Sequence, residues 1–257
     1  MFHGICHLSS LVLRRAPDHR SEMVSQLLFG ELYTIQQREN EWTEVCCCYD
    51  QYSGWLMTSQ LNELTEKEYG LIKKQSVSVV IDLLSMTSSP ARSFPILAGS
   101  SLFNFDGINY SLGKSKFVFN GQAVVPSFSN FANQLEKIAL RYLEAPYLWG
   151  GRSPLGIDCS GFSQMVYKYF GLPLPRDAWQ QAEQGIIVHF VEESQPGDLA
   201  FFHNDEGRIT HVGIILSDRR IIHASSKVRI DTLDHFGIFQ AESKKYTHQL
   251  KIIKRMC

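Results

Sequence analysis

The segment that most constrains this chain runs from Gly150 to Phe162 and places one cysteine between a glycine-rich loop and a predicted helix. Asp158 is a good N-cap residue, so Cys159 falls in the first turn of that helix. The positive end of a helix dipole favours thiolate over thiol, so we expect Cys159 to be nucleophilic near neutral pH. The apolar residues after it recur at the spacing of one helix face, at Phe162, Met165, Val166, Tyr169 and Phe170.

Two histidines follow in a segment that is typical of strands joined by short polar turns. If the turn at 217–219 is a three-residue loop, Gly213 pairs with His223, and His211 then shares one sheet face with His223, about 7–8 Å away at the backbone. A two-residue loop would place the histidines on opposite faces. In the first register His211 can take the thiol proton of Cys159, while His223 orients the His211 ring.

Each of these residues also has a simpler interpretation. A single cysteine is usually an inert small hydrophobe, and a histidine on an apolar strand is more often a core residue than a base. The combination is more specific, because the glycine-rich approach, the helix-start cysteine and the histidine-bearing hairpin occur in a workable order. The remaining histidines without a partner pattern are expected at the surface: His189, His203, His235 and His248.

Six short motifs carry a resemblance to a known family. They are Tyr147-Leu148-Trp149-Gly150-Gly151, Asp158-Cys159-Ser160-Gly161, Pro175-Arg176-Asp177, Pro196-Gly197-Asp198-Leu199, His211-Val212-Gly213-Ile214 and His223-Ala224. In this order they resemble the NlpC-type papain-like cysteine peptidases, which cut peptidoglycan stem peptides. The resemblance implies Cys159 as nucleophile, His211 as base and His223 as the third polar residue. It also implies Tyr147 near the oxyanion site, beside the backbone N–H of Cys159.

The first half of the chain predicts small β-barrels. Short alternating segments separated by turn residues fill 1–62 and resemble a bacterial SH3-like domain. Residues 63–126 repeat the design more loosely, as a divergent second SH3-like domain, and 127–257 form the NlpC-type peptidase domain. The predicted fold class is therefore α+β: two N-terminal SH3-like small β-barrels followed by a papain-like α+β catalytic domain.

This domain order resembles a narrower group, the γ-D-glutamyl-L-diamino acid endopeptidases of the dipeptidyl-peptidase VI type. The implied partner is a murein-derived peptide, L-Ala-γ-D-Glu-diamino acid, with a free N-terminal alanine and either lysine or diaminopimelate in third position. Recognition of a free ammonium calls for carboxylate and aromatic groups at the blind end of a cleft. Asp177 is the first candidate, and Glu22 and Tyr52 of the first domain are second candidates that would close this cleft as a specificity filter.

The candidate substrate-binding residues have structural alternatives. Asp177 fits a helix cap, Glu22 a solvated surface charge, and Tyr52 an aromatic at the edge of the barrel. Trp149, which the resemblance places at the γ-D-glutamyl site, fits core packing equally well.

The residues around the nucleophile can also be interpreted either as substrate-binding or as structural. By resemblance Asp158 and Ser160 help to shape the γ-D-glutamyl site. Arg176 either binds a substrate carboxylate or forms a surface ion pair with Asp177 or Glu183.

Composition and charge exclude several partner classes. Hydrophobic residues make up 44% and charged residues 20% of the chain, ordinary values for a soluble globular protein. The net charge of −1 gives nucleic acid and anionic membranes no electrostatic support. No stretch approaches the roughly 20 apolar residues that a membrane span needs.

The cysteines and the first residues bear on location. Neighbours in the run Cys46-Cys47-Cys48 cannot bridge one another on a strand, and unpaired cysteines favour a reducing compartment. The start at Met1 lacks a basic region, a long apolar region and a cleavage site, so we expect no signal peptide and a cytoplasmic protein. The alternative is a periplasmic or exported protein, if this start is not the native one.

The predicted function is a monomeric cysteine peptidase of cell-wall peptide recycling that needs no metal and no cofactor. It would hydrolyse the γ-D-glutamyl-L-diamino acid bond of stem peptides with a free N-terminal L-alanine. The alternatives are a secreted lytic peptidoglycan endopeptidase, a non-hydrolytic wall-binding protein, and a transferase on the same thiol scaffold.

Overall fold

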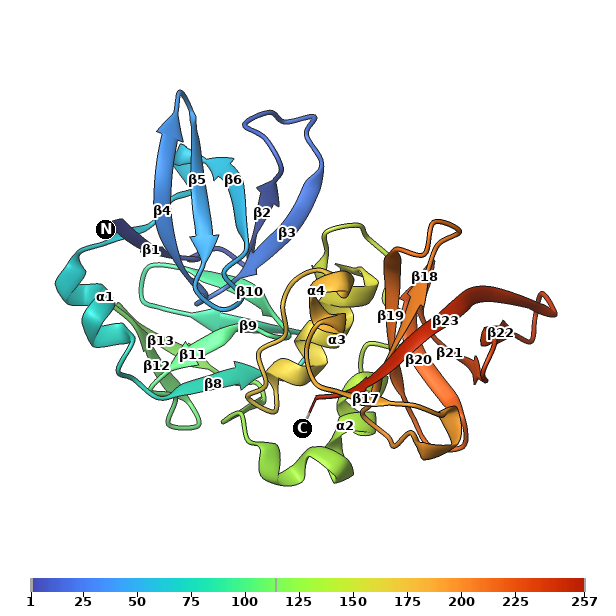
Figure 1. Cartoon of the computed structure of the whole chain (residues 1–257). Helices are drawn as coiled ribbons and strands as arrows, with labels where there is room; N and C mark the ends of the chain where they lie inside the picture. The colour runs from blue at the N-terminus through green and yellow to red at the C-terminus, as the bar shows by residue number, and fades with distance from the viewer. Residues whose placement is uncertain (1, 114, 257) are drawn as a thin grey trace. The chain divides into compact units, whose positions relative to one another are not determined.

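A computed structural model describes residues 2–113 and 115–256, which divide into two compact units. The first unit holds the residues up to 126 together with a short segment, 149–154, and the second holds 127–148 and the residues from 155 on. Figure 1 shows the course of the chain. Among the described residues, no helix has both the length and the apolar character that crossing a membrane requires.

Residues 2–64 form one antiparallel sheet in the first unit. Alternate apolar residues such as Leu11, Leu13 and Val45 point into its core, which is the alternation that the sequence predicts. The strand order is β3-β2-β6-β5-β4-β1-β7. The elements are β1 (Phe2–Ile5), β2 (Ser10–Arg14), β3 (Met23–Leu28), β4 (Leu32–Glu39), β5 (Trp42–Cys47), β6 (Ser53–Met57), the 3-10 helix Thr58–Gln60, β7 (Glu63–Leu64) and α1 (Glu66–Ile72).

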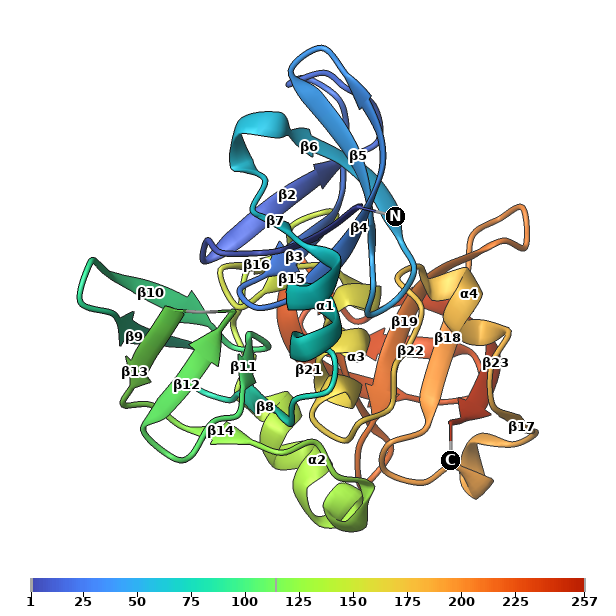
Figure 2. The same cartoon turned by 90° about the vertical axis from the view of Figure 1, so that its left-hand side faces the viewer.

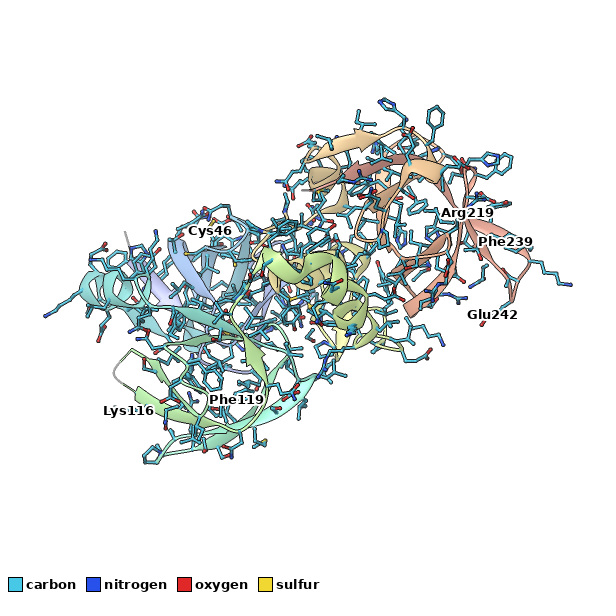
Figure 3. All side chains as sticks on the ribbon, turned by 90° about the horizontal axis from the view of Figure 1, so that it is seen from below. Cys46, Lys116, Phe119, Arg219, Phe239 and Glu242 are labelled. Atoms are coloured by element: carbon cyan, nitrogen blue, oxygen red, sulfur yellow. The ribbon has the colours of Figure 1, made fainter. Side chains whose placement is uncertain are left out.

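The cysteine run lies at the end of β5. Cys46 and Cys47 belong to the strand, as predicted, whereas Cys48 lies just after it; Cys46 is labelled in Figure 3. The described cysteines are all free, and they are Cys6, Cys46, Cys47, Cys48 and Cys159.

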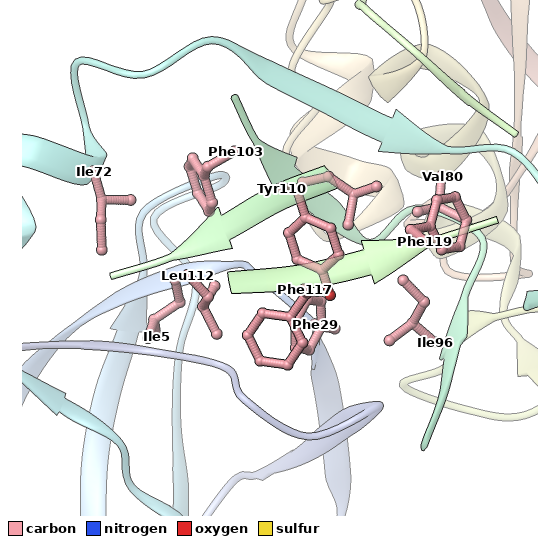
Figure 4. Close-up of a cluster of buried hydrophobic side chains, with 11 residues drawn as sticks. Ile5, Phe29, Ile72, Val80, Ile96, Phe103, Tyr110, Leu112, Phe117 and Phe119 are labelled. Carbon is pink, nitrogen blue, oxygen red and sulfur yellow. The ribbon is translucent and has the colours of Figure 1, made fainter. Parts of the chain in front are cut away.

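A second antiparallel sheet follows in the same unit and shares a hydrophobic core with the first. Ile5 and Phe29, from the first sheet region, pack in one cluster with Tyr110 and Phe117 of the second (Figure 4). The rings of Phe29 and Tyr110 meet edge to face with centroids 6.0 Å apart. The strand order is β10-β9-β13-β12-β11-β8-β14, with β8 (Val77–Val80), β9 (Leu84–Ser88), β10 (Ser93–Leu97), β11 (Ser101–Phe103), β12 (Asn109–Leu112), β13 (Ser115–Phe119) and β14 (Ala123–Val124).

The second unit combines short helices with a strand-rich barrel, which confirms the α+β class. Its strand order is β17-β23-β18-β19-β20-β21-β22, and β22 also pairs with β23, so that β18 to β23 close on themselves. The helices are α2 (Phe131–Leu140), α3 (Cys159–Lys168) and α4 (Ala178–Ala182), with 3-10 turns at Phe128–Asn130 and Val191–Glu193. The strands are β16 (Gly156–Ile157), β17 (Ile186–Val188), β18 (Leu199–His203), β19 (Ile209–Ile215), β20 (Arg220–Ser225), β21 (Lys227–Leu233), β22 (Gly237–Gln240) and β23 (Lys245–Arg255).

Helix α3 lies against the barrel. Its residues Phe162, Met165 and Val166 are fully buried, as their helical spacing predicts. The helix packs on β19 and β20, and Figure 2 shows it beside β19. The first residue of α3 is therefore set next to the strand that carries His211.

A buried ion pair anchors segment 149–154, which includes β15 (Arg152–Ser153), within the first unit. The guanidinium of Arg152 donates to both carboxylate oxygens of Glu31 at 2.8 and 3.0 Å, and both side chains are almost completely buried. Gly150 has a φ of +76°, and a Cβ there would lie 2.4 Å from the carbonyl oxygen of Met23, so only glycine fits this approach. Both contacts fix the glycine-rich segment that precedes Cys159.

We predict that Glu31→Leu lowers the free energy of unfolding by about 3–5 kcal/mol, because Arg152 would lose the carboxylate that compensates its buried charge. The double variant Glu31→Leu/Arg152→Met should lose much less, since an apolar pair of similar volume can replace a buried ion pair. Urea denaturation followed by tryptophan fluorescence measures both. A double variant as unstable as the single variant would contradict this role of the pair.

Candidate active site

Cys159 is the first residue of α3, as predicted, and Asp158 is the N-cap. The Oδ1 atom of Asp158 accepts a hydrogen bond from the backbone N–H of Gly161 at 2.7 Å. The cap leaves the N–H of Cys159 without an acceptor inside the helix, as helix geometry requires of the first turn. This places an amide donor beside the thiol.

A buried arginine holds this cap in place. Arg176 donates to both carboxylate oxygens of Asp158, at 2.6 and 3.0 Å, and to Oγ of Ser160 at 3.0 Å. Only 1% of Arg176 is exposed, so the predicted surface ion pair with Asp177 or Glu183 is wrong. The local spacing suggested a surface pair, but the chain after α3 returns to the helix start and buries the guanidinium there.

The two predicted histidines meet on one sheet face. In the pairing of β19 with β20, Gly213 lies opposite His223, and the N–H of Leu216 donates to the carbonyl of Arg220 at 2.8 Å across the loop. This confirms the three-residue loop and its register. The Nε2 atom of His211 then lies 2.8 Å from Nδ1 of His223, and both side chains are buried.

The thiol lies beside the backbone of β19 at His211. The Sγ atom of Cys159 is 4.0 Å from the carbonyl oxygen of Thr210, the residue before His211. Because Nε2 of His211 is engaged with His223, its other ring nitrogen, Nδ1, is the one left for the thiol. Helix start and hairpin thus bring nucleophile, base and third polar residue into one site.

Two further residues at this site were missed by sequence reasoning. Asp231 of β21 lies with Oδ2 3.0 Å from Nε2 of His223. His248 of β23 stacks on His211, with ring centroids 4.1 Å apart, so its predicted surface location is wrong. Asp231 could have been found from the alternation of Arg229 and Asp231 on the strand after His223, but His248 is brought in by the barrel closure, which has no local signal.

His211, His223 and His248 lie close enough together to be considered as metal ligands. Their ring nitrogens lie within 4.8 Å of one another. However, the rings of His211 and His248 are stacked, only 24° from parallel, so their in-plane lone pairs run side by side rather than converge on one ion. The nitrogens of His211 and His223 that face each other already share a hydrogen bond, and the cluster suits a hydrogen-bonded relay better than metal ligation.

The resting thiol is not activated by its helix position. Burial raises the pKa of Cys159 to about 12, with a further contribution from the charge of Asp158, against which backbone hydrogen bonds and Arg176 act in the opposite direction. Desolvation therefore outweighs the preference of the helix dipole for a thiolate in the resting site.

Both catalytic candidates among the histidines are held neutral. Burial lowers the pKa of His211 well below its usual value, and His223 and His248 lower it further. Burial also lowers the pKa of His223, although its hydrogen bond with Asp231 opposes this. At neutral pH the site holds a neutral thiol and a neutral imidazole base.

Tyr147 and Asp177 lie in the same unit as the nucleophile. Burial, followed by the charges of Cys159 and Asp158, raises the pKa of Tyr147, which is half-buried near the thiol. Asp177 is the N-cap of α4, and its N–H donates to Oε1 of Gln180 at 3.1 Å. The structural alternative for Asp177 is thus realised, while its half-buried side chain leaves the binding alternative open to experiment.

The other three candidates belong to the first unit. Trp149 donates from Nε1 to Oε1 of Glu22 at 2.6 Å and is 58% exposed, so its interpretation as a core residue is wrong. The second oxygen of Glu22 accepts from Arg15 at 2.5 Å, which together with Trp149 lowers the pKa of the Glu22 carboxyl. Tyr52 packs against the hydrophobic core of the first sheet.

Comparison with known families agrees with this geometry. Residues 144–248, which include Cys159, His211 and His223, match the model of the NlpC/P60 family. The chain carries an NlpC/P60 cysteine peptidase domain. Residues 13–61 match the bacterial dipeptidyl-peptidase SH3 domain, which confirms the first SH3-like domain.

Relatives extend the likeness along most of the chain. The gamma-D-glutamyl-L-lysine dipeptidyl-peptidase of Bacillus cereus is 26% identical over 232 residues, 79% of this chain and 68% of the relative. Dipeptidyl-peptidase 6 of Lysinibacillus sphaericus is 27% identical over 246 residues, 85% and 87% of the two chains. A crystal structure of an NlpC/P60 family protein from Bacillus cereus covers 99% of both chains with a TM-score of 0.84 at 22% identity, which supports the fold.

We predict that iodoacetamide modifies Cys159 faster as pH rises through the alkaline range, without a plateau near neutral pH. Because the pKa is raised, only a small fraction of Cys159 is thiolate at neutral pH, and this fraction increases as the pH approaches 12. Intact-protein mass spectrometry follows the rate, with Cys159→Ala as the control for the other cysteines. A plateau at pH 6–8 would show a preformed ion pair with His211 instead.

Proposed function

We propose that this peptidase hydrolyses the γ-D-glutamyl-L-diamino acid bond of murein stem peptides that carry a free N-terminal L-alanine. The observation that carries the substrate class is the match to two dipeptidyl-peptidases over 79% and 85% of this chain, together with the dipeptidyl-peptidase SH3 domain at 13–61. The probable endopeptidase p60 of Listeria seeligeri, by contrast, matches over 100 residues only, 38% of this chain.

The reaction follows from the atoms at the site. As Sγ of Cys159 attacks the carbonyl carbon, the thiol proton passes to Nδ1 of His211. The imidazolium then gives this proton to the leaving amine, and a thioester joins the γ-D-glutamyl group to Cys159. Water, deprotonated by His211, attacks the thioester and releases the free acid. His223 keeps the His211 ring in place throughout.

The oxyanion is held at the start of α3. We assign the backbone N–H of Cys159 as one donor, since the helix leaves it without an internal acceptor, and the hydroxyl of Tyr147 as the other. Because burial and the neighbouring charges raise the pKa of Tyr147, this hydroxyl stays protonated and can donate.

Asp177 is our candidate for the ammonium group of the N-terminal alanine. It is ionisable, half-buried and at the start of α4, in the same unit as Cys159. Glu22, Tyr52 and Trp149 remain predicted contributors from the first unit. Lysine and diaminopimelate both remain candidates for the residue after the cut.

We extend the proposal to peptide recycling in the cytoplasm. The specificity for a free amine suits peptides already released from the wall, because a stem attached to glycan has no free alanine amine. The free state of the described cysteines suits a reducing compartment.

The test is product analysis by mass spectrometry. We expect the protein to release L-Ala-γ-D-Glu from L-Ala-γ-D-Glu-L-Lys and not from its N-acetylated form or from intact peptidoglycan, and we expect Cys159→Ala to release nothing while keeping its fold. Cleavage of blocked peptide or intact wall would support a lytic endopeptidase. Product that forms only with an added amine acceptor would support a transferase, and no cleavage of any substrate would support a wall-binding protein.

Asp177→Asn separates capping from recognition. Asparagine caps a helix about as well as aspartate, so the melting temperature should stay close to that of the parent. Loss of a charge-assisted hydrogen bond, worth about 1.5–3 kcal/mol, should lower kcat/KM for the free-amine peptide about 10- to 100-fold. An unchanged preference for the free-amine peptide would show that Asp177 does not bind the ammonium group. Asp177→Ala should lower the melting temperature as well, because alanine cannot cap the helix.

A further inference from the structure

A row of hydrogen-bonded side chains continues behind the base. His211 meets His223 at 2.8 Å, and His223 meets Asp231 at 3.0 Å. Arg229 in turn donates to both oxygens of Asp231, from Nε at 2.7 Å and from Nη2 at 2.9 Å. The members come from β19, β20 and β21. Glu242, which is labelled in Figure 3, ends the row with a contact to Arg229 at 3.2 Å.

The sheet register explains this row. In the pairing of β20 with β21, His223 lies opposite Arg229. Asp231 is two residues further along β21, so its side chain points to the same face as that of Arg229. Asp231 is therefore a diagonal cross-strand neighbour of His223, close enough for their side chains to make a hydrogen bond.

The donors and acceptors in the row can be assigned in only one way. A carboxylate accepts hydrogen bonds and donates none, so the proton between Asp231 and His223 is on Nε2 of His223. A neutral imidazole carries one ring proton, so Nδ1 of His223 is an acceptor and Nε2 of His211 must donate to it. The lone pair of His211 is then on Nδ1, the nitrogen that remains for the thiol.

The charges around the row support this assignment. Burial opposes ionisation of Asp231, but its hydrogen bonds with His223 and Arg229 lower its pKa to about 2. Burial keeps His223 neutral by lowering its pKa. The other titratable ring that faces His223 is His248 of β23, whose pKa burial lowers to about 4, so it too is neutral.

We propose that Asp231, held by Arg229, is a positioning residue that fixes the ring tautomers of both His223 and His211 and so makes Nδ1 of His211 the base for Cys159. Without this carboxylate His223 can place its proton on Nδ1. His211 Nε2 would then have to accept, its own proton would sit on Nδ1, and it could not take the proton of the thiol. Asp231 contacts His223 and Arg229, so its effect on the thiol passes through the two histidines.

The first measurement is of the tautomers themselves and needs no substrate. In protein with 15N-labelled histidine, long-range proton–nitrogen spectra should show His211 and His223 each protonated on Nε2 alone. Single His→Gln variants assign the signals among the nine histidines of the chain. In Asp231→Ala we expect a mixture of Nε2-protonated and Nδ1-protonated forms of His223. Persistence of the Nε2 form in that variant would overturn the proposal.

The second measurement is kinetic and rests on the substrate proposed above. Asp231→Ala should lower kcat for L-Ala-γ-D-Glu-L-Lys about 100-fold, the lower limit of what a positioned general base contributes, with KM within about twofold because the side chain does not contact substrate. An unchanged kcat would overturn the proposal. A parent enzyme that fails to cut this peptide would count against the substrate class only, since the spectra still decide the tautomers.

Asp234→Ala is the matched control. Asp234 follows the same strand and accepts a hydrogen bond from Tyr246 at 2.5 Å rather than from a histidine, so its loss should leave kcat and the tautomers unchanged. If Asp231→Ala does not fold, Asp231→Leu keeps a side chain of similar volume and offers His223 no acceptor. It should disturb the tautomers as Asp231→Ala does, and parent-like spectra and kcat in that variant would overturn the proposal.

Discussion

The buried ion pair between Asp158 and Arg176 is the interaction on which the nucleophile depends. One oxygen of Asp158 accepts the N–H of Gly161 and so begins α3 at Cys159, while Arg176 binds both oxygens at 2.6 and 3.0 Å. With Arg176 only 1% exposed, removal of either partner would take the counter-ion of this pair away from a buried charge. Because Ser160 is bound by the same arginine, the residues flanking the thiol act by fixing the helix start.

Energetic magnitudes decide the state of the thiol. A helix N-terminus stabilises a nearby negative charge by about 0.3–1 kcal/mol. The rise in pKa of Cys159 from 9.0 to about 12 corresponds to roughly 4 kcal/mol against the thiolate. Burial therefore outweighs the dipole, and nucleophilicity has to come from proton transfer to His211 during the attack rather than from a resting thiolate.

The parts of the site that depend on local sequence could be predicted, and the rest could not. Capping by Asp158 and the register of Gly213 with His223 follow from spacing within a few residues, and the structure confirms both. Arg176 is buried because the chain after α3 runs back to the start of that helix. His248 stacks on His211 because β23 closes the barrel. No pattern in one segment contains these contacts.

The fold was predictable to a similar degree. Alternating apolar residues indicated the first SH3-like barrel, and a family match confirms it. The shared cluster of Phe29 with Tyr110 and Phe117 joins two segments that the sequence divides at about residue 62. Alternation shows which side chains point inward but not which other sheet they meet.

Asp231 does not contact the base His211 directly, because His223 lies between them. A carboxylate in direct contact with His211 would favour its protonated form and raise its pKa, and the base would then be occupied at neutral pH. With His223 between them, Asp231 orients His211 without holding a proton on it, and the pKa of His211 stays low. At rest the charge of Asp231 is balanced by Arg229. Proton transfer from Cys159 to His211 during the attack then creates one imidazolium near the oxyanion that forms at the carbonyl, a pair of opposite charges whose attraction is strong in a buried site.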